Sequence, residues 1–155
     1  MDLPPADRTL LVARAATRLC LALGWAPLPE LRLPDGRRLD ILALRADGGL
    51  AAIEVKSCAR DFLADAKWPE YRAWCDALYF AVDVDFPEDL LPADAGLIVA
   101  AEGGAAVIRE APAHQLPPAR RAALLRRFAA VAATRLARAA DPAGAAMLGA
   151  ALAVE

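Results

Sequence analysis

The sequence is poor in the residues that usually build disulfide and zinc sites. It contains one histidine and three cysteines, and no two cysteines stand in a CxxC pair. An odd number of dispersed cysteines argues against a disulfide framework and against a structural zinc site. The thiols fit a reducing compartment, so we expect the protein in the cytoplasm. The single histidine, His114, lies in a proline-flanked stretch and offers little basis for catalysis.

Long apolar runs and a strong net charge are also missing. The amino-terminal stretch MDLPPADRTL has no basic region followed by an apolar run, so we expect no signal peptide. No stretch of about 18 apolar residues is free of charge, so we expect no membrane partner. The net charge of −2 is not typical of a nucleic-acid coat protein. Residues 111–140, however, carry six arginines and no acid, which permits an anionic partner or forms a solvated helix face.

The 155 residues are 58% hydrophobic, which predicts one globular domain over 1–155. A helix between the third and fourth strands implies a crossover, so these two strands should be parallel. The class is mixed α/β, a mixed central sheet flanked by helices in the order αβββαβ, followed by a β-hairpin and C-terminal helices. We expect a helix over 5–25 with Asp7 as N-cap and Gly24 at its end, strands over 30–33, 38–44 and 50–57, a helix over 60–75, a strand over 76–84, a hairpin over 96–111, and helices over 116–140 and 141–155.

Three charged residues stand inside the hairpin that turns at 47–49. Asp40 lies in its first strand, and Glu54 and Lys56 lie in its second. Side chains alternate along a strand, so Glu54 and Lys56 share a face, and one register of the hairpin brings Asp40 beside Glu54. Adjacent carboxylates repel each other unless a cation lies between them. Mg²⁺ or Mn²⁺ suits such oxygen ligands, and the carbonyl of Val55 can add another.

Hydrolysis of a phosphodiester is the chemistry that needs this set of groups. The carboxylates of Asp40 and Glu54 hold the metal, and Lys56 orients the attacking water or stabilises developing charge. The alternative is an ordinary cross-strand ion pair on a solvated face, in which Lys56 or Arg38 neutralises one of the acids. Such exposed pairs stabilise a fold by roughly 0–1 kcal/mol.

The residues also resemble a known superfamily. Asp40, a turn and then IEVK at 53–56 resemble the PD-(D/E)xK nucleases, in which this motif lies on a hairpin followed by a helix. The stretch IEVKSCARDFLADAKWPEYRAWCDALYFAVDVDFP is similar to the MmcB-type bacterial DNA repair proteins, which share its EVKS, DFxxDxKWxxY and CDxxYFAV elements. This resemblance implies a restriction-endonuclease-like core, DNA as substrate and repair proteins as possible partners.

The resemblance also suggests which residues surround the site. Many PD-(D/E)xK nucleases carry another acid on the first helix, but this helix has no Glu between Arg8 and Trp25, so Glu30 is a tentative metal ligand. Lys67 and Tyr71 share a face if their helix is continuous, but Pro69 between them should start a new helical turn or kink the helix. Asp65 is a possible partner of Lys56 or Lys67. A fold of this kind that has lost cleavage and only binds DNA or a repair partner is the alternative. The expected substrate-binding residues are Ser57, Lys67, Tyr71, Arg120 and Arg127.

Overall fold

The computed structural model describes residues 3–152, with side chains up to residue 147. The chain divides into two compact units, Met1–Pro118 and Ala119–Glu155, which are described separately below. The single domain expected over 1–155 stays a prediction.

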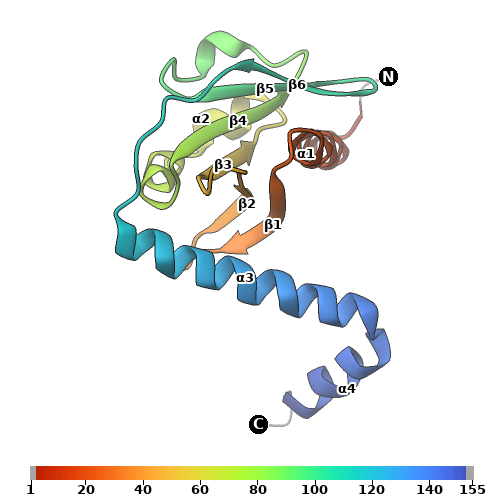
Figure 1. Ribbon diagram of the computed structural model, residues 1–155. Coiled ribbons are helices and arrows are strands. Elements are labelled where there is room, and N and C mark those ends of the chain that lie inside the picture. The colour runs from red at the N-terminus through yellow and green to blue at the C-terminus, as the bar shows by residue number, and fades with distance from the viewer. Residues whose placement is uncertain (1–2, 153–155) are drawn as a thin grey trace. The chain divides into compact units, whose positions relative to one another are not determined.

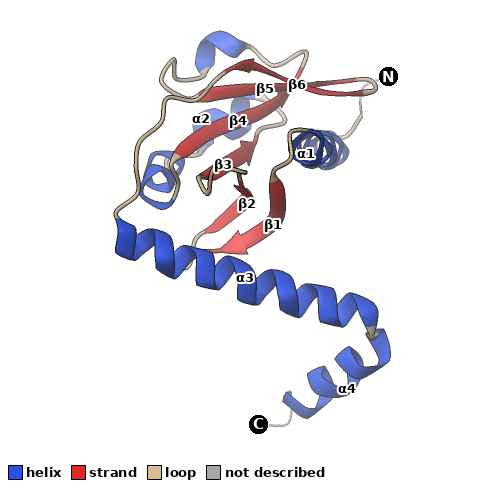
Figure 2. Cartoon of the chain, in the orientation of Figure 1, coloured by secondary structure: helices blue, strands red, loops and turns tan. Residues whose placement is uncertain are grey.

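A six-stranded mixed sheet forms the centre of the first unit (Figures 1 and 2). Its strands follow one another in sequence order, from β1 at one edge to β6 at the other. The β1–β2, β2–β3 and β5–β6 pairs are antiparallel, and β3–β4 and β4–β5 are parallel, which confirms the predicted crossover. The strands are β1 Ala26–Arg32, β2 Arg38–Leu44, β3 Leu50–Val55, β4 Ala77–Asp83, β5 Gly96–Ala101 and β6 Gly104–Arg109.

Helices pack on both faces of this sheet, as expected for the fold class. Helix α1, Pro5–Ala22, buries Val12, Ala16 and Cys20 against the face that contains Ile53 and Tyr79. The opposite face is covered by α2, Ala59–Ala64, and by the 3₁₀ helix η1, Trp68–Trp74. A second 3₁₀ helix, η2, Glu88–Leu90, lies between β4 and β5.

Aromatic side chains attach α2 and η1 to the sheet. The ring centroids of Phe62 and Trp68 lie 5.5 Å and 5.3 Å from that of Phe80, and both pairs meet edge to face. This is a favourable geometry for aromatic pairs. The result is that the segment after β3 is held on one face of the sheet while α1 occupies the other.

Glycine is required at two positions of the sheet. Gly48 has φ +84° in the turn between β2 and β3, and this left-handed conformation favours glycine. Gly96 pairs with Tyr79, and a Cβ atom at Gly96 would lie 2.2 Å from the tyrosine ring. The tyrosine therefore packs flat over β5 only because Gly96 lacks a side chain.

Three expected features of the first unit are wrong in detail. Helix α1 begins at Pro5 with Pro4 before it, so Asp7 lies in the first turn and is not the N-cap. Strand β1 begins at Ala26, four residues before the expected start. The helix over 60–75 has the new turn that was expected at Pro69, where η1 forms, but it is also broken at Asp65, which is extended.

The second unit consists of two helices, α3 Pro118–Ala140 and α4 Pro142–Leu152. Asp141 caps helix α4, since its Oδ1 accepts a hydrogen bond of 3.0 Å from the N–H of Gly144. Among helices of the described residues, none has the length and apolar character needed to span a membrane.

Candidate active site at the open end of the β2–β3 hairpin

The two candidate metal ligands lie side by side where β2 and β3 separate. The last residues paired in this direction are Ile41 and Ile53, so Asp40 faces Glu54 across the next position. The N–H of Asp40 donates to Glu54 Oε1 at 3.2 Å, and the N–H of Val55 donates to Asp40 Oδ2 at 2.8 Å. The two carboxyl groups thus accept hydrogen bonds from backbone N–H groups that lie beyond the last paired residues of β2 and β3.

Burial makes this pair of acids costly to ionise. Glu54 is only 3% exposed. Its burial, together with the negative charge of Asp40, raises the pKa of Glu54 to about 8. Burial also raises the pKa of Asp40, although the Val55 N–H and the charges of Lys56 and Arg38 oppose this change. A pair of this kind holds a shared proton at neutral pH unless a cation replaces it.

Lys56 is buried beside the two acids and is already paired. Its Nζ lies 2.6 Å from Asp65 Oδ2, and the residue is 8% exposed. Burial opposes ionisation of Asp65, but the hydrogen bond from Lys56 and a second one from the Lys67 N–H lower its pKa overall. The lysine also attracts Asp40 and Glu54 electrostatically. The structure therefore brings Asp40, Glu54 and Lys56 together, with Asp65 as a fourth member that we expected only as a possible partner of Lys56 or Lys67.

The residues expected to bind substrate from 57 to 71 divide into buried and exposed ones. Ser57 is buried and donates to Asp61 Oδ2 at 2.6 Å, which ties the end of β3 to the first turn of α2. Tyr71 is buried and donates to the carbonyl of Arg38 at 3.3 Å. Burial and the nearby carboxylates raise the pKa of Tyr71 to about 12, so its hydroxyl stays protonated.

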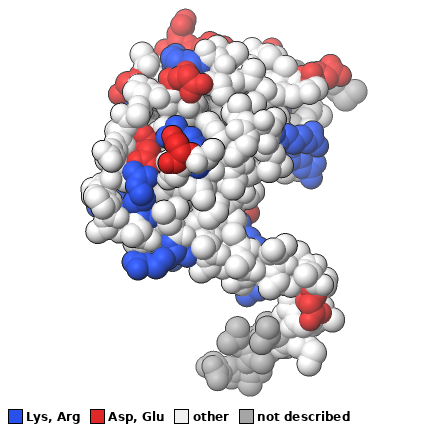
Figure 3. Space-filling model, viewed as in Figure 1, with Lys and Arg blue, Asp and Glu red and all other residues white. Residues whose placement is uncertain are grey.

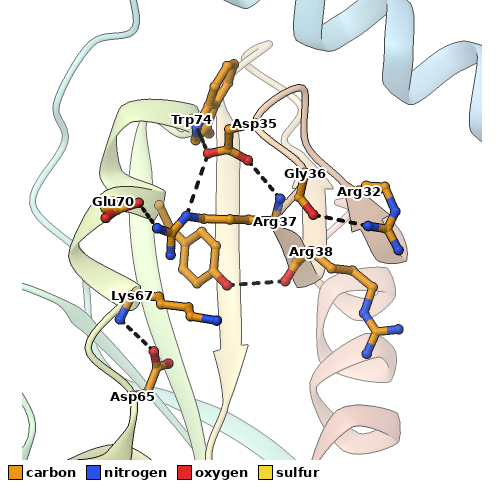
Figure 4. Close-up of polar contacts among 10 residues, drawn as sticks. Arg32, Asp35, Gly36, Arg37, Arg38, Asp65, Lys67, Glu70 and Trp74 are labelled. Carbon is orange, nitrogen blue, oxygen red and sulfur yellow. Dashed lines mark hydrogen bonds and ion pairs between the residues drawn. The ribbon is translucent and has the colours of Figure 1, made fainter.

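Lys67 is exposed, and it does not share a helical face with Tyr71, because the helix is interrupted before η1. Figure 4 shows how a polar network joins η1 to the turn between β1 and β2. There Arg37 pairs with Glu70, and Trp74 donates to Asp35. This network fixes the segment that carries the buried tyrosine.

Glu30 lies on β1, the strand beside that of Asp40. Its neighbours Pro29 and Leu31 pair with Ile41 and Leu39, which places Glu30 across from Asp40. Its φ of +53° is the only positive value of a non-glycine residue among the described ones. Such strain is unfavourable and tends to occur at functional sites. Its carboxylate lies 3.8 Å from the guanidinium of Arg38.

A cleft of about 890 Å³ runs between α1 and the edge of the sheet at this site. Asp40, Val55, Glu30 and Arg38 line one wall. The wall provided by α1 contains charged residues that we did not assign to the site from the sequence, Asp7, Arg14 and Arg18. The sequence places these residues on the polar side of the amphipathic first helix. Only the packing of that helix on the sheet shows that this side lines a cleft.

The donor set fits a hard divalent cation only in part. Asp40 and Glu54 are adjacent carboxylates, and Asp40 and Val55 line the cleft, whereas Glu54 and Lys56 do not. No group of three or more His, Cys, Asp or Glu side chains in the part of the chain that the structure describes is arranged to hold a metal. The protein therefore offers two carboxylates, and the remaining positions would belong to backbone, water or substrate.

The other two expected substrate-binding residues lie in the second unit. Arg120 is exposed and Arg127 is half-buried on α3. Their assignment stays a prediction.

Comparison with known proteins identifies the family. The family model described as DNA repair protein MmcB-like matches residues 1–143, which include all of the site. The chain belongs to the MmcB-like family. This confirms the resemblance and associates the protein with DNA repair.

A solved structure supports the same architecture. The SPO1766 protein of unknown function from Silicibacter pomeroyi is 42% identical, with a TM-score of 0.83 over 93% of this chain and 97% of that chain. No curated protein matches the MmcB-like chain. The association with repair therefore comes from the family, whereas metal binding and cleavage stay predictions.

Proposed function

We propose that this MmcB-like protein is a metal-dependent phosphodiesterase that acts on DNA during repair. The observation that carries the proposal is the pair of adjacent acids, in which Glu54 is buried and Asp40 is half-buried and lines an open cleft. Two acids in this position disfavour their own ionisation, and a divalent cation would remove that penalty. The membership of a DNA repair family supports DNA as the substrate class.

Each residue of the site has a role in this proposal. Asp40 and Glu54 would hold Mg²⁺ or Mn²⁺ together with the carbonyl of Val55, and Glu30 would contribute from β1. When bound, the metal would polarise a phosphodiester and favour ionisation of water. Lys56 positions its ammonium beside the carboxylates and would orient the nucleophile, while Asp65 holds that ammonium in place. Tyr71, which keeps its proton and donates it to the Arg38 carbonyl, cannot act as a base.

A second function is a repair module that binds DNA or a partner without cleaving. One observation favours it, namely that Lys56 is engaged with Asp65 at 2.6 Å while both acids accept backbone hydrogen bonds. In this reading the charged residues hold the open end of the hairpin together. The module would then bind no metal.

Cleavage and metal binding separate these two functions. We would incubate plasmid and branched DNA with the wild type, Glu54→Gln and Asp40→Asn in the presence of Mg²⁺ or Mn²⁺. Glu102→Gln, which changes an exposed acid at the β5–β6 turn, is the matched control. The proposal expects cleavage by the wild type and the control, and a loss of at least about 100-fold in the two site variants.

Calorimetric titration with Mn²⁺ gives an independent result. Binding by the wild type that disappears in Glu54→Gln supports the phosphodiesterase. No cleavage of either DNA together with no binding at millimolar Mn²⁺ rejects it and leaves the non-cleaving module.

A further inference from the structure

Helix α1 presents two arginines to the candidate cleft. Arg14 and Arg18 both line it, on the same side of the helix as Leu10. They are four residues apart, so their attachment points lie about 6 Å apart along the helix axis. The buried face of α1, which includes Val12 and Ala16, packs on the sheet, so the cleft side of the helix is held rigidly beside Asp40.

These two arginines differ from the other arginines around the sheet. Arg8 pairs with Asp83, Arg38 with Glu30, and Arg72 with Asp94. Arg14 and Arg18 are exposed and have no ion-pair partner among the described side chains. In the space-filling view, basic side chains protrude where α1 lies (Figure 3). Arg14 and Arg18 therefore form a positive stretch of the cleft, and no acid of the described residues forms an ion pair with either of them.

The sign of the charge changes along this wall. Asp7 lies near the amino-terminal end of α1, and Arg14 and Arg18 lie two to three turns further along. Asp40 faces the same cleft from the sheet. A chain of phosphates that follows α1 would thus meet two cations in line and pass Asp40, the member of the acid pair that lines the cleft.

The remaining lining favours one strand of DNA. Leu10, Ala13 and Pro29 add apolar surface, and Leu10 is 48% exposed. Bases and sugars of an unpaired strand can cover such surface, whereas in a duplex the bases are stacked inside. The cleft volume of about 890 Å³ is that of a site for a compact ligand. It can accept a few nucleotides of a single strand.

We propose that Arg14 and Arg18 bind successive phosphates of single-stranded DNA lying in the cleft along α1. This inference rests on the proposed function only in taking DNA as the ligand of the cleft beside Asp40. The two arginines position the strand and take no part in the reaction. Their contribution is therefore electrostatic and depends on salt.

Fluorescence anisotropy with a labelled single-stranded oligonucleotide tests this proposal. We would measure the Kd of the full chain from 50 to 200 mM salt for the wild type, Arg14→Gln, Arg18→Gln and the double variant. Arg60→Gln is the matched control, because Arg60 is an exposed arginine on α2, which covers the opposite face of the sheet. Thermal melting monitored by circular dichroism would check that each variant is folded.

Removal of each phosphate contact should reduce the slope of log K against log salt by about 0.7. We expect a reduction of about 1.4 and a binding loss of about tenfold or more in the double variant, with no change in Arg60→Gln. An unchanged slope in the double variant, an equal loss in the control, or tighter binding of a duplex of the same length would overturn the proposal.

Titration with Mn²⁺ keeps this result separate from the proposed function. The double variant should bind Mn²⁺ as the wild type does, because both arginines act on the strand and not on the carboxyl pair. Loss of DNA binding with unchanged metal binding supports the role of α1. A strand that binds through Arg14 and Arg18 in a protein without metal binding would refute the phosphodiesterase and leave this inference standing.

Discussion

Replacing Glu54 by glutamine tests the central feature of the site, its buried acid pair. Glutamine has nearly the same shape, and its Oε1 can still accept the hydrogen bond that the Asp40 N–H gives to Glu54. The substitution therefore removes a titratable group and leaves the backbone contact. A difference between the wild type and Glu54→Gln in how stability depends on pH then reports the free-energy cost of ionising Glu54.

The size of this cost follows from the pKa of Glu54. The pKa of Glu54 rises from 4.5 to about 8 on folding, so the folded state is more stable when this carboxyl group is protonated than when it is ionised. The folded chain holds a proton that the unfolded chain has released between these two values, so stability falls as pH rises through this window. At about 1.4 kcal/mol per pH unit, the wild type without metal should lose about 2 kcal/mol between pH 6 and pH 8. Glu54→Gln should lose little of this.

Urea unfolding followed by tryptophan fluorescence is a suitable assay, because Trp25, Trp68 and Trp74 all lie in the first unit. For a typical m-value, a loss of about 2 kcal/mol lowers the unfolding midpoint by about 1 M urea. Glu102→Gln should follow the wild type at every pH. Parallel pH profiles of the wild type and Glu54→Gln would refute the argument that Glu54 is neutral in the folded protein near pH 7.

Three further outcomes are expected. Binding of Mn²⁺ should release protons below pH 8, and its affinity should fall by up to about tenfold per pH unit as the pH is lowered. Calorimetry in buffers of different ionisation enthalpy measures both effects. Equal affinity at pH 6 and pH 8.5 would contradict this prediction. Asp65→Asn should destabilise the fold by about 1–3 kcal/mol in urea, because the buried Lys56 ammonium loses its charged partner; a change below about 0.5 kcal/mol would show that the pair is not important. Gly96→Ala should cost about 1–3 kcal/mol or more by forcing Tyr79 to move, whereas Gly104→Ala, whose Cβ would meet open space, should be close to neutral in the same assay.

The order of the elements could be predicted from the sequence because local signals agree with it. The turn at 47–49 contains Gly48 with positive φ, and the alternation in the flanking strands fixes the register that sets Asp40 opposite Glu54. The boundaries were harder to place. Asp7 looks like an N-cap, yet proline at position 5 already supplies the fixed φ that starts a helix.

The helix expected over 60–75 shows why local patterns can mislead. Its apolar residues have helical spacing, but the carboxylate of Asp65 accepts the Lys67 N–H, and Pro69 cannot continue the backbone ladder. At the interruption Asp65 pairs with Lys56, one of the two partners that the sequence left open. The interruption also separates Lys67 from Tyr71, so the condition for their shared face, a continuous helix, is not met.

The chemistry of the acid pair can be argued further from its contacts. Asparagine and glutamine would accept the same two backbone hydrogen bonds that Asp40 and Glu54 accept, and neither would carry a charge into a buried position. The hairpin alone therefore does not require carboxylates. Lys56 cannot balance them fully, because Asp65 already holds its ammonium at 2.6 Å. A second cation beside Asp40 would balance the excess charge, and Asp40 is the member of the pair that lines the same cleft as Arg14 and Arg18.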